Sequence, residues 1–195
     1  MTDAATVSAG VMTLDEFIRR YDQEGPFEIL DGEIVPKMPN VFGHSVVIKK
    51  VFVALLPYEQ QGYGEVFPET TFVLLDIADW VKGSRIPDLL FVSAGRLEAY
   101  RATRQDWQQK PLILVPDLVV EVVSPNDSYT EIGKRIVRYF EDGVRMVWVV
   151  DPQLKQVIVH VPDSDQQTKL SGNDVLTGGD VLLNFTLKLS DLFSA

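Results

Sequence analysis

A short apolar segment with one acidic residue in its middle limits the fold of this chain more than any other feature. Residues 116–124 read PDLVVEVVS, so leucine and β-branched valine surround Glu121. The run ends at Ser124 and the proline after it, both turn-forming residues. Such a run is typical of a strand buried on both faces, and it therefore predicts a sheet that helices cover.

The acidic side chain of Glu121 is costly to bury in that setting. Burying a carboxylate costs free energy unless something pairs with it, because burial disfavours the charged form. Either the group is protonated, or a lysine, an arginine or a metal ion lies beside it. One interpretation is a structural ion pair with Arg85, Lys134 or Arg135, since buried charges are usually paired. The other is coordination of a metal ion.

Capping signals and apolar spacing predict three helices. A capping box, Thr-x-x-Glu, at residues 13–16 opens the first. Residues 44–60 repeat apolar side chains at helical spacing, and Pro57 marks an end or a kink. A second capping box opens a helix over residues 128–142. The buried stripe of this third helix is expected to consist of Ile132, Ile136, Val137 and Phe140.

Strand signals fill most of the remaining chain. An Asp-Gly pair at residues 31–32, between two apolar segments, predicts a hairpin with a two-residue turn. Residues 76–84 are expected to be a connection, and residues 94–110 are either a helical insertion or a mobile loop. Further strands are expected over residues 65–67, 71–75, 85–93, 117–124, 144–150 and 156–161.

This order of elements predicts an α/β (α+β) fold. A mixed sheet is flanked by helices, with a hairpin near the N-terminus and an antiparallel extension near the C-terminus. Residues 12–195 are expected to form a single domain. Residues 1–11 are small and polar and are expected to be disordered or frayed.

Composition narrows the class of protein. Hydrophobic residues make up 46% and charged residues 24% of the chain, the values of an ordinary globular protein. The absence of cysteine excludes disulfides and cysteine-ligated zinc. No apolar run is long enough to span a membrane, so a cytoplasmic protein without membrane contact is expected. The net charge of −10 argues against a general nucleic-acid coat protein, although residues 82–110 are locally basic.

A second acid in an apolar, strand-like setting suggests a partner for Glu121. Asp88 lies in the sequence IPDLLFV. If the two strands are neighbours, both carboxylates can converge on one hard cation such as Mg²⁺, with the backbone carbonyl of Val122 as a further ligand. Such an ion polarises a phosphoryl oxygen and activates a bound water. Lys134, from the following helix, would stabilise the transition state.

The same residues carry a resemblance to a known family. Pro87 and Asp88, then a strand with Glu121, then a lysine, are similar to the PD-(D/E)XK nuclease superfamily. More narrowly, the chain resembles the Uma-type putative restriction endonucleases, a bacterial family. The matching segments are MTLDEF from residue 12, FEILDGEIV from residue 27, His44, IPDLLFV from residue 86, PDLVVEVVSP from residue 116, Lys134, GVRMVWVVDP from residue 143 and LKLSDLF from residue 187.

The resemblance implies a restriction-endonuclease-like fold over residues 12–195 and an endonuclease that hydrolyses DNA with Mg²⁺ or Mn²⁺. Asp88 and Glu121 are then the metal-binding acids, and Lys134 is the catalytic lysine moved onto a helix. The usual lysine position, two residues after the acid, holds Val123 here. By analogy with enzymes that cut both strands, a homodimer is expected.

Four further residues are candidates for the surroundings of the site. His44 lines the cleft or binds phosphate, or else it caps or packs its helix. Glu33 adds an outer contact or is a solvated hairpin residue, and Ser124 bonds near the site or merely ends the strand. Arg85 is a candidate partner for the acids.

Two other functional classes compete with the nuclease. A nuclease fold retained as a catalytically weak module, binding DNA or a protein partner, agrees with Val123 and with the acidic net charge. A glycosidase with two carboxylates is the weaker alternative, since no aromatic sugar platform lies near either acid in the sequence.

Overall fold

The computed structural model describes residues 12–76, 79–125, 127–162 and 167–194. The segment expected to be frayed, residues 1–11, lies outside the described residues. The chain divides into two compact units. Unit 1 contains the chain up to Met38 with Thr71–Ile86 and Asp106–Leu114, and unit 2 contains Pro39–Thr70, Pro87–Gln105 and Val115–Ala195. The single domain expected over residues 12–195 stays a prediction.

Unit 1 is a five-stranded sheet against which α1 packs. The strand order is β1-β6-β2-β3, and β5 also pairs with β6. The Glu16 amide donates a hydrogen bond to the Thr13 hydroxyl at 3.3 Å, so Thr13 is the N-cap that the first capping box predicted. The elements of unit 1 are β1 (Met12–Thr13), α1 (Leu14–Glu24), β2 (Phe27–Leu30), β3 (Glu33–Pro36), β5 (Phe72–Leu75) and β6 (Trp80–Arg85).

The predicted hairpin of unit 1 is confirmed. Strands β2 and β3 pair antiparallel, with Leu30 opposite Glu33. The φ angles of the two turn residues are positive, 52° at Asp31 and 84° at Gly32. Both positive values are those of a type I′ turn, whose twist matches that of the strands.

The expectation of a connection over residues 76–84 was wrong, because β6 (Trp80–Arg85) is a strand at the centre of unit 1. Its sequence WVKGSR has no apolar run to reveal it. Pairing with β1, β2 and β5 supplies its backbone hydrogen bonds, and these partners are distant in sequence. A Cβ atom at Gly83 would lie 2.9 Å from an Arg85 guanidinium nitrogen, so the glycine makes room for that side chain.

Unit 2 contains a six-stranded mixed sheet in the order β11-β10-β9-β8-β7-β4 and a separate pair, β12-β13. Strands β8 and β9 are parallel, whereas the other neighbours are antiparallel. The elements are α2 (Phe42–Gln60), β4 (Gly64–Pro68), β7 (Leu89–Ser93), α3 (Ala94–Thr103), β8 (Leu118–Val122), α4 (Tyr129–Asp142), β9 (Met146–Asp151), β10 (Gln156–His160), β11 (Thr168–Ser171), β12 (Val175–Gly178), β13 (Leu182–Lys188) and α5 (Leu189–Leu192).

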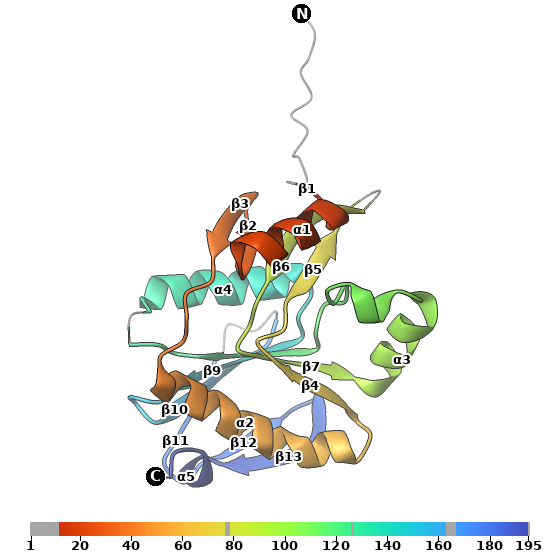
Figure 1. The fold of residues 1–195 in the computed structure, drawn as a ribbon. Helices are drawn as coiled ribbons and strands as arrows, with labels where there is room; N and C mark the ends of the chain where they lie inside the picture. The colour runs from red at the N-terminus through yellow and green to blue at the C-terminus, as the bar shows by residue number, and fades with distance from the viewer. Residues whose placement is uncertain (1–11, 77–78, 126, 163–166, 195) are drawn as a thin grey trace, which may run out of the picture. The chain divides into compact units, whose positions relative to one another are not determined.

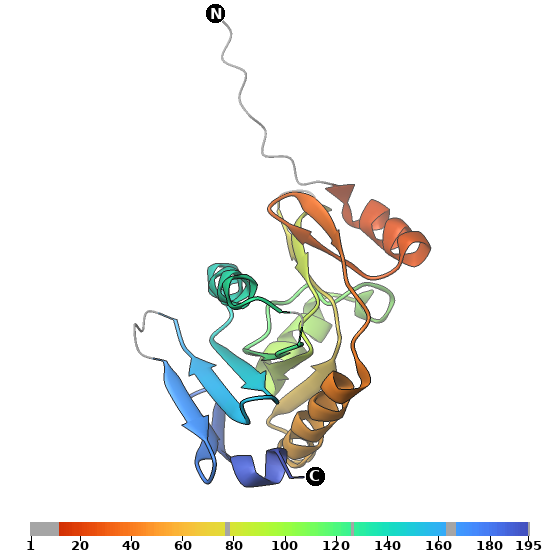
Figure 2. The same cartoon turned by 90° about the vertical axis from the view of Figure 1, so that its left-hand side faces the viewer.

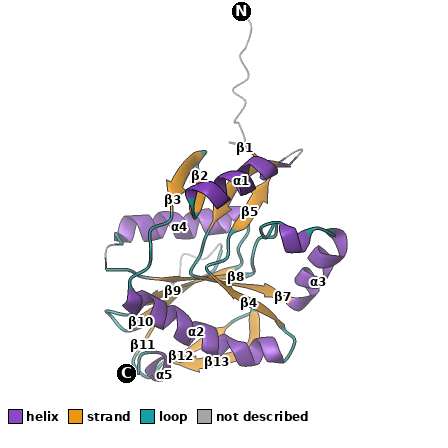
Figure 3. Ribbon diagram, in the orientation of Figure 1, coloured by secondary structure: helices purple, strands orange, loops and turns teal. Residues whose placement is uncertain are grey.

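Helices cover both faces of this six-stranded sheet, as the apolar strand predicted. Helix α2 lies on one face and α4 on the other (Figures 1 and 2). The pair β12-β13 and α5 lie on the α2 side (Figure 3). The fold of mixed sheet and flanking helices therefore agrees with the expected restriction-endonuclease-like class.

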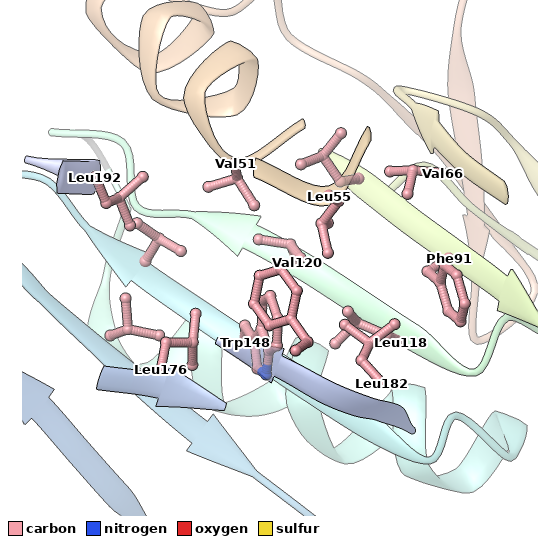
Figure 4. Close-up of a cluster of buried hydrophobic side chains, with 14 of the residues drawn as sticks. Val51, Leu55, Val66, Phe91, Leu118, Val120, Trp148, Leu176, Leu182 and Leu192 are labelled. Carbon is pink, nitrogen blue, oxygen red and sulfur yellow. The ribbon is translucent and has the colours of Figure 1, made fainter. Parts of the chain in front are cut away.

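The core of unit 2 explains the alternation along β8. Leu118, Val120 and Val122 are buried in one cluster with side chains of α2 and β9. Figure 4 shows Leu118 and Val120 beside Val51 of α2 and Trp148 of β9. Since successive side chains of a strand point to opposite faces, Val119 and Glu121 face α4. The central strand is thus buried on both sides.

Several local predictions for unit 2 require adjustment. Helix α2 continues through Pro57 to its end at Gln60, so the proline does not end it. The predicted strand over residues 85–93 begins only at Leu89. Of the two alternatives for residues 94–110, the helical one is present over residues 94–103. In α4, Val137 is 57% exposed, and Tyr139 is the fully buried residue.

Among the described residues, no helix combines the length and apolarity needed to cross a bilayer.

The start of β8 is held by Asp117, whose side chain is fully buried. Its carboxylate accepts a hydrogen bond from the Ser93 amide at 2.9 Å and lies 2.8 Å from Arg96 and 3.2 Å from Arg145. Burial raises the pKa of Asp117, but the Ser93 amide and the two guanidinium groups together lower this pKa by more than burial raises it. The pKa therefore lies below its ordinary value of 3.8.

Replacing this acid should destabilise the protein in a pH-dependent way. We expect Asp117→Asn to lower the free energy of unfolding at pH 7 by about 1–3 kcal/mol, because charged hydrogen bonds are lost. A depressed pKa stabilises the fold above the unfolded value and loses that contribution as pH falls through the folded pKa. The difference from wild type in urea unfolding should therefore shrink below pH 3.8.

Asp180→Asn is the control, because Asp180 is exposed. A wild-type-like stability for Asp117→Asn at pH 7 would contradict the role given to the buried acid.

Candidate active site

The candidate site lies where β7 begins and β8 ends. These two strands are neighbours, and their last paired position sets Leu89 opposite Val120. Asp88 directly precedes Leu89, and Glu121 directly follows Val120. Because β7 and β8 run antiparallel, the two predicted acids both lie directly beyond the same end of the ladder.

The end of β8 is sealed by two side chains. Strand β7 starts too late to pair with Val122, so the carboxylate of Asp88 accepts the hydrogen bond of the Val122 amide at 2.7 Å. The Nε2 atom of His44 lies 2.7 Å from the Val122 carbonyl oxygen. It also lies 3.1 Å from the Asp88 carboxylate. Asp88 and His44 are both buried. Their contacts supply hydrogen-bond partners for the Val122 backbone at a position that β7 does not reach.

Helix α2 brings His44 to this position. The helix begins at Phe42, and His44 therefore lies in its first turn. Its backbone amide donates to the Val41 carbonyl oxygen at 3.0 Å, while the ring reaches β8. The structure therefore shows the His44 side chain in contact with Asp88 and with the Val122 carbonyl oxygen.

Glu121 points to the opposite face of β8 and meets α4. Its buried carboxylate accepts a hydrogen bond from the Tyr139 hydroxyl and lies 3.3 Å from Arg135. Ser128 and Gly143 hold this helix at its ends: the Ser128 hydroxyl accepts from Glu131, and Gly143 has a positive φ of 100°. The structural ion pair considered from the sequence is thus present, with Arg135 as the cation.

Lys134 has a different partner. Its Nζ atom lies 2.8 Å from the Glu131 carboxylate, one turn earlier in α4. The hydrogen bond to Lys134 lowers the pKa of Glu131 below its ordinary value. The Lys134 side chain is 55% exposed. The contact with Glu131 places Lys134 at the helix surface. The role of Lys134 as the catalytic lysine stays a prediction.

The other predicted residues are divided between the units. Ser124 follows β8, and its amide donates to the Asp127 carboxylate at 2.8 Å. Arg85 belongs to unit 1, where its guanidinium donates to the Ile29 carbonyl oxygen at 2.7 Å. Glu33 is an exposed residue of β3 in unit 1. The structure thus brings Asp88 and His44 together at the Val122 backbone, and it brings Arg135 and Tyr139 to the adjacent Glu121.

Two residues of this arrangement were not predicted as site residues. Tyr139 is absent from the buried stripe expected for this helix, and its hydroxyl donates a hydrogen bond to Glu121. Asp117 was also not predicted, because it lies directly before the apolar run and not inside it as Glu121 does. A spacing of four residues places Arg135 and Tyr139 on one face of α4, and that spacing was available in the sequence.

The donor atoms at the end of β8 suit a hard divalent cation. Asp88, Glu121 and the Val122 carbonyl offer oxygen atoms, which Mg²⁺ and Mn²⁺ prefer. Within the described part of the chain, no three acidic, histidine or cysteine side chains form a group that could hold a metal ion. Such an ion would therefore depend on the carbonyl, on waters and on substrate phosphate, as Mg²⁺ commonly does.

Comparison with known proteins identifies the class. The chain belongs to the Uma2 family, described as putative restriction endonuclease, whose model matches residues 14–190. A crystal structure of a putative nuclease of DUF820 from Anabaena variabilis ATCC 29413 superposes with a TM-score of 0.74. The two chains are 23% identical over 94% of this chain and 98% of the other, which shows a shared fold. No curated protein matches the sequence.

The seal at the end of β8 yields a prediction about stability. We expect Asp88→Ala to lower the free energy of unfolding by about 1–3 kcal/mol, because the buried Val122 amide loses its acceptor. Asp88→Asn retains a carbonyl oxygen and should cost less. Hydrogen exchange of the Val122 amide reports the contact directly: exchange should be fastest in Asp88→Ala. Equal protection in all three proteins would contradict the assignment.

Proposed function

We propose that this protein is an endonuclease that hydrolyses phosphodiester bonds of DNA with Mg²⁺ or Mn²⁺. Family membership supports a nuclease, that is, a hydrolase acting on nucleic acid. The observation that carries the finer proposal is the position of the two acids. Asp88 and Glu121 both lie directly beyond the last paired position of β7 and β8, and both are next to Val122, in contact or in sequence.

In this proposal, Asp88, Glu121 and the Val122 carbonyl hold the metal ion. When bound, the ion polarises a phosphoryl oxygen and lowers the pKa of a bound water. His44 keeps Asp88 and the Val122 carbonyl in place through its two contacts. The histidine thus acts as a positioning residue, since the donor atoms must be held closely for binding and catalysis.

Helix α4 supplies cations for the phosphate. Lys134 and Arg135 are successive residues near its start, and both are exposed enough to meet a ligand. Arg135 anchors Glu121, whereas Lys134 holds only a surface carboxylate. Exposed ion pairs contribute little free energy, so Lys134 can exchange Glu131 for a phosphate oxygen. We therefore assign transition-state stabilisation to Lys134.

The remaining expectations are part of the same proposal. DNA is the substrate that we favour. We propose a homodimer, because two active sites could then act on the two strands. We also propose a cytoplasmic location for the protein. These assignments rest on the family and on analogy with enzymes that cut both strands.

A second candidate function has one observation in its favour. Arg135 and Tyr139 already satisfy Glu121, so its burial requires no metal ion. Val123 stands where the superfamily has a lysine, and the net charge is −10. A catalytically weak module that binds DNA or a protein partner agrees with these facts.

Cleavage of supercoiled plasmid with and without Mg²⁺ or Mn²⁺ tests the nuclease. We expect cleavage by wild type only with metal, and a loss of at least about 100-fold in Asp88→Asn and Glu121→Gln, the scale seen when one group that stabilises the transition state is removed. Asp180→Asn is the matched control, since it removes an exposed carboxylate of unit 2. Equal background in all four proteins would rule the proposal out.

Calorimetric titration with Mn²⁺ separates the enzyme from the weak module. The enzyme should bind the ion, and Asp88→Asn should weaken that binding. His44→Ala should also weaken binding, by about 10–100-fold, because residues that orient metal ligands have effects of this size. Lack of binding by the wild type would support the weak module.

A further inference from the structure

A large cavity lies beside the candidate site, between α4 and the strands β9 and β10. It has a volume of about 500 Å³. This volume falls in the range of about 300–1,000 Å³ that small-molecule sites occupy. Because α4 lies on the face opposite α2 (Figure 2), the cavity is separate from the core shown in Figure 4.

The walls of the cavity are mainly apolar. Ile132 and Ile136 of α4 face Val149 of β9 and Ile158 of β10 across it. Tyr129, at the first position of α4, also lines it and is 82% exposed. An exposed aromatic ring beside apolar walls is suited to stacking against a flat ring system.

Polar side chains complete the lining, and they are Asp127, Asp151, Gln156, His160 and Gln167. Gln156 and His160 of β10 are both buried and both line the cavity. They share the face of Ile158 because alternate residues of a strand point the same way, whereas Val157 belongs to the opposite core. Burial lowers the pKa of His160, so its neutral imidazole can donate one hydrogen bond and accept another. The amide of Gln156 can also do both.

The cavity is continuous with the surroundings of Glu121. A small hollow lined by Glu121, Val122 and Arg135 adjoins it. The residues that line both spaces are Val123, Asp127, Ile132, Ile136 and Val149. A ligand in the cavity would thus lie next to the hollow that Glu121 and Arg135 of the candidate site line.

We propose that this cavity receives one unpaired nucleobase of the substrate strand, next to the phosphate at the candidate active site. This inference rests on the proposed function and specifies its substrate as a single-stranded or locally unpaired strand. Apolar walls and the Tyr129 ring contact the faces of the base, while Gln156 and His160 meet its polar edge. A base inside a duplex presents neither faces nor its full edge, so it must be unpaired to enter.

Gly133 offers a way to fill the cavity without damaging the fold. It lines the cavity, and a Cβ atom added there would have no neighbour within 4 Å. Leucine is also a better helix former than glycine, so Gly133→Leu should preserve or raise the melting temperature. Loss of binding in this variant would not result from unfolding.

The experiment is a nuclear magnetic resonance titration of the full chain, without metal, with the four deoxynucleoside monophosphates and the four ribonucleoside monophosphates. We expect saturable shifts at residues of α4 and β10 at millimolar ligand, and at least tenfold weaker binding by Gly133→Leu. Gly95→Leu is the matched control, because Gly95 is also a helical glycine with open space. It should bind like wild type. The two sugar series distinguish DNA from RNA as the source of the base.

Three results would overturn the inference. They are no binding of any nucleotide, equal binding by both leucine variants and wild type, and binding of inorganic phosphate with the same shifts. Light scattering on the same samples tests a second copy of the chain as the occupant: self-association lost only in Gly133→Leu would assign the cavity to it. Because this titration needs no metal and no cleavage, its failure is distinguishable from failure of the nuclease proposal.

Discussion

The sheet of unit 2 depends on how buried carboxylates complete the backbone hydrogen bonds around β8. Asp117 directly precedes the strand. Its carboxylate accepts a hydrogen bond from the Ser93 amide and pairs with the guanidinium groups of Arg96 and Arg145. At the other end of the strand, the Asp88 carboxylate accepts a hydrogen bond from the Val122 amide, and His44 Nε2 is hydrogen-bonded to the Val122 carbonyl oxygen. Without these side chains, polar groups of the central strand would be buried without partners, which costs more than most single contacts contribute.

This arrangement relates the fold to the proposed chemistry. The carboxylate that seals β8 lies beside the strand that carries Glu121, so the structural need for Asp88 and a metal-binding role use the same atoms. Glu121 in turn is held by Arg135 and Tyr139, which can keep a carboxylate charged in the interior. A site whose acids are already satisfied by the protein is stable without an ion, so this stability agrees with both candidate functions.

The signals that succeeded in the sequence were local. The N-caps of the two capping boxes, the Asp-Gly turn and the apolar run around Glu121 each involve neighbouring residues, and all are present in the structure. Local patterns failed where pairing partners decide the outcome. Strand β6 has no apolar run, and the stripe predicted for α4 included Val137, which lines an open cavity instead of the core.

By itself, the sequence determined that a covered mixed sheet would bury an acid, and it named Asp88 as a second acid that would converge with it if their strands were neighbours. The tertiary structure alone decided which side chain meets which. His44 reaches Val122 across 78 residues, and Asp88 reaches it across 34. Arg135 rather than Lys134 contacts Glu121, because the turn of α4 directs one side chain to the sheet and the other to the surface. Such choices depend on how elements pack, which no local pattern encodes.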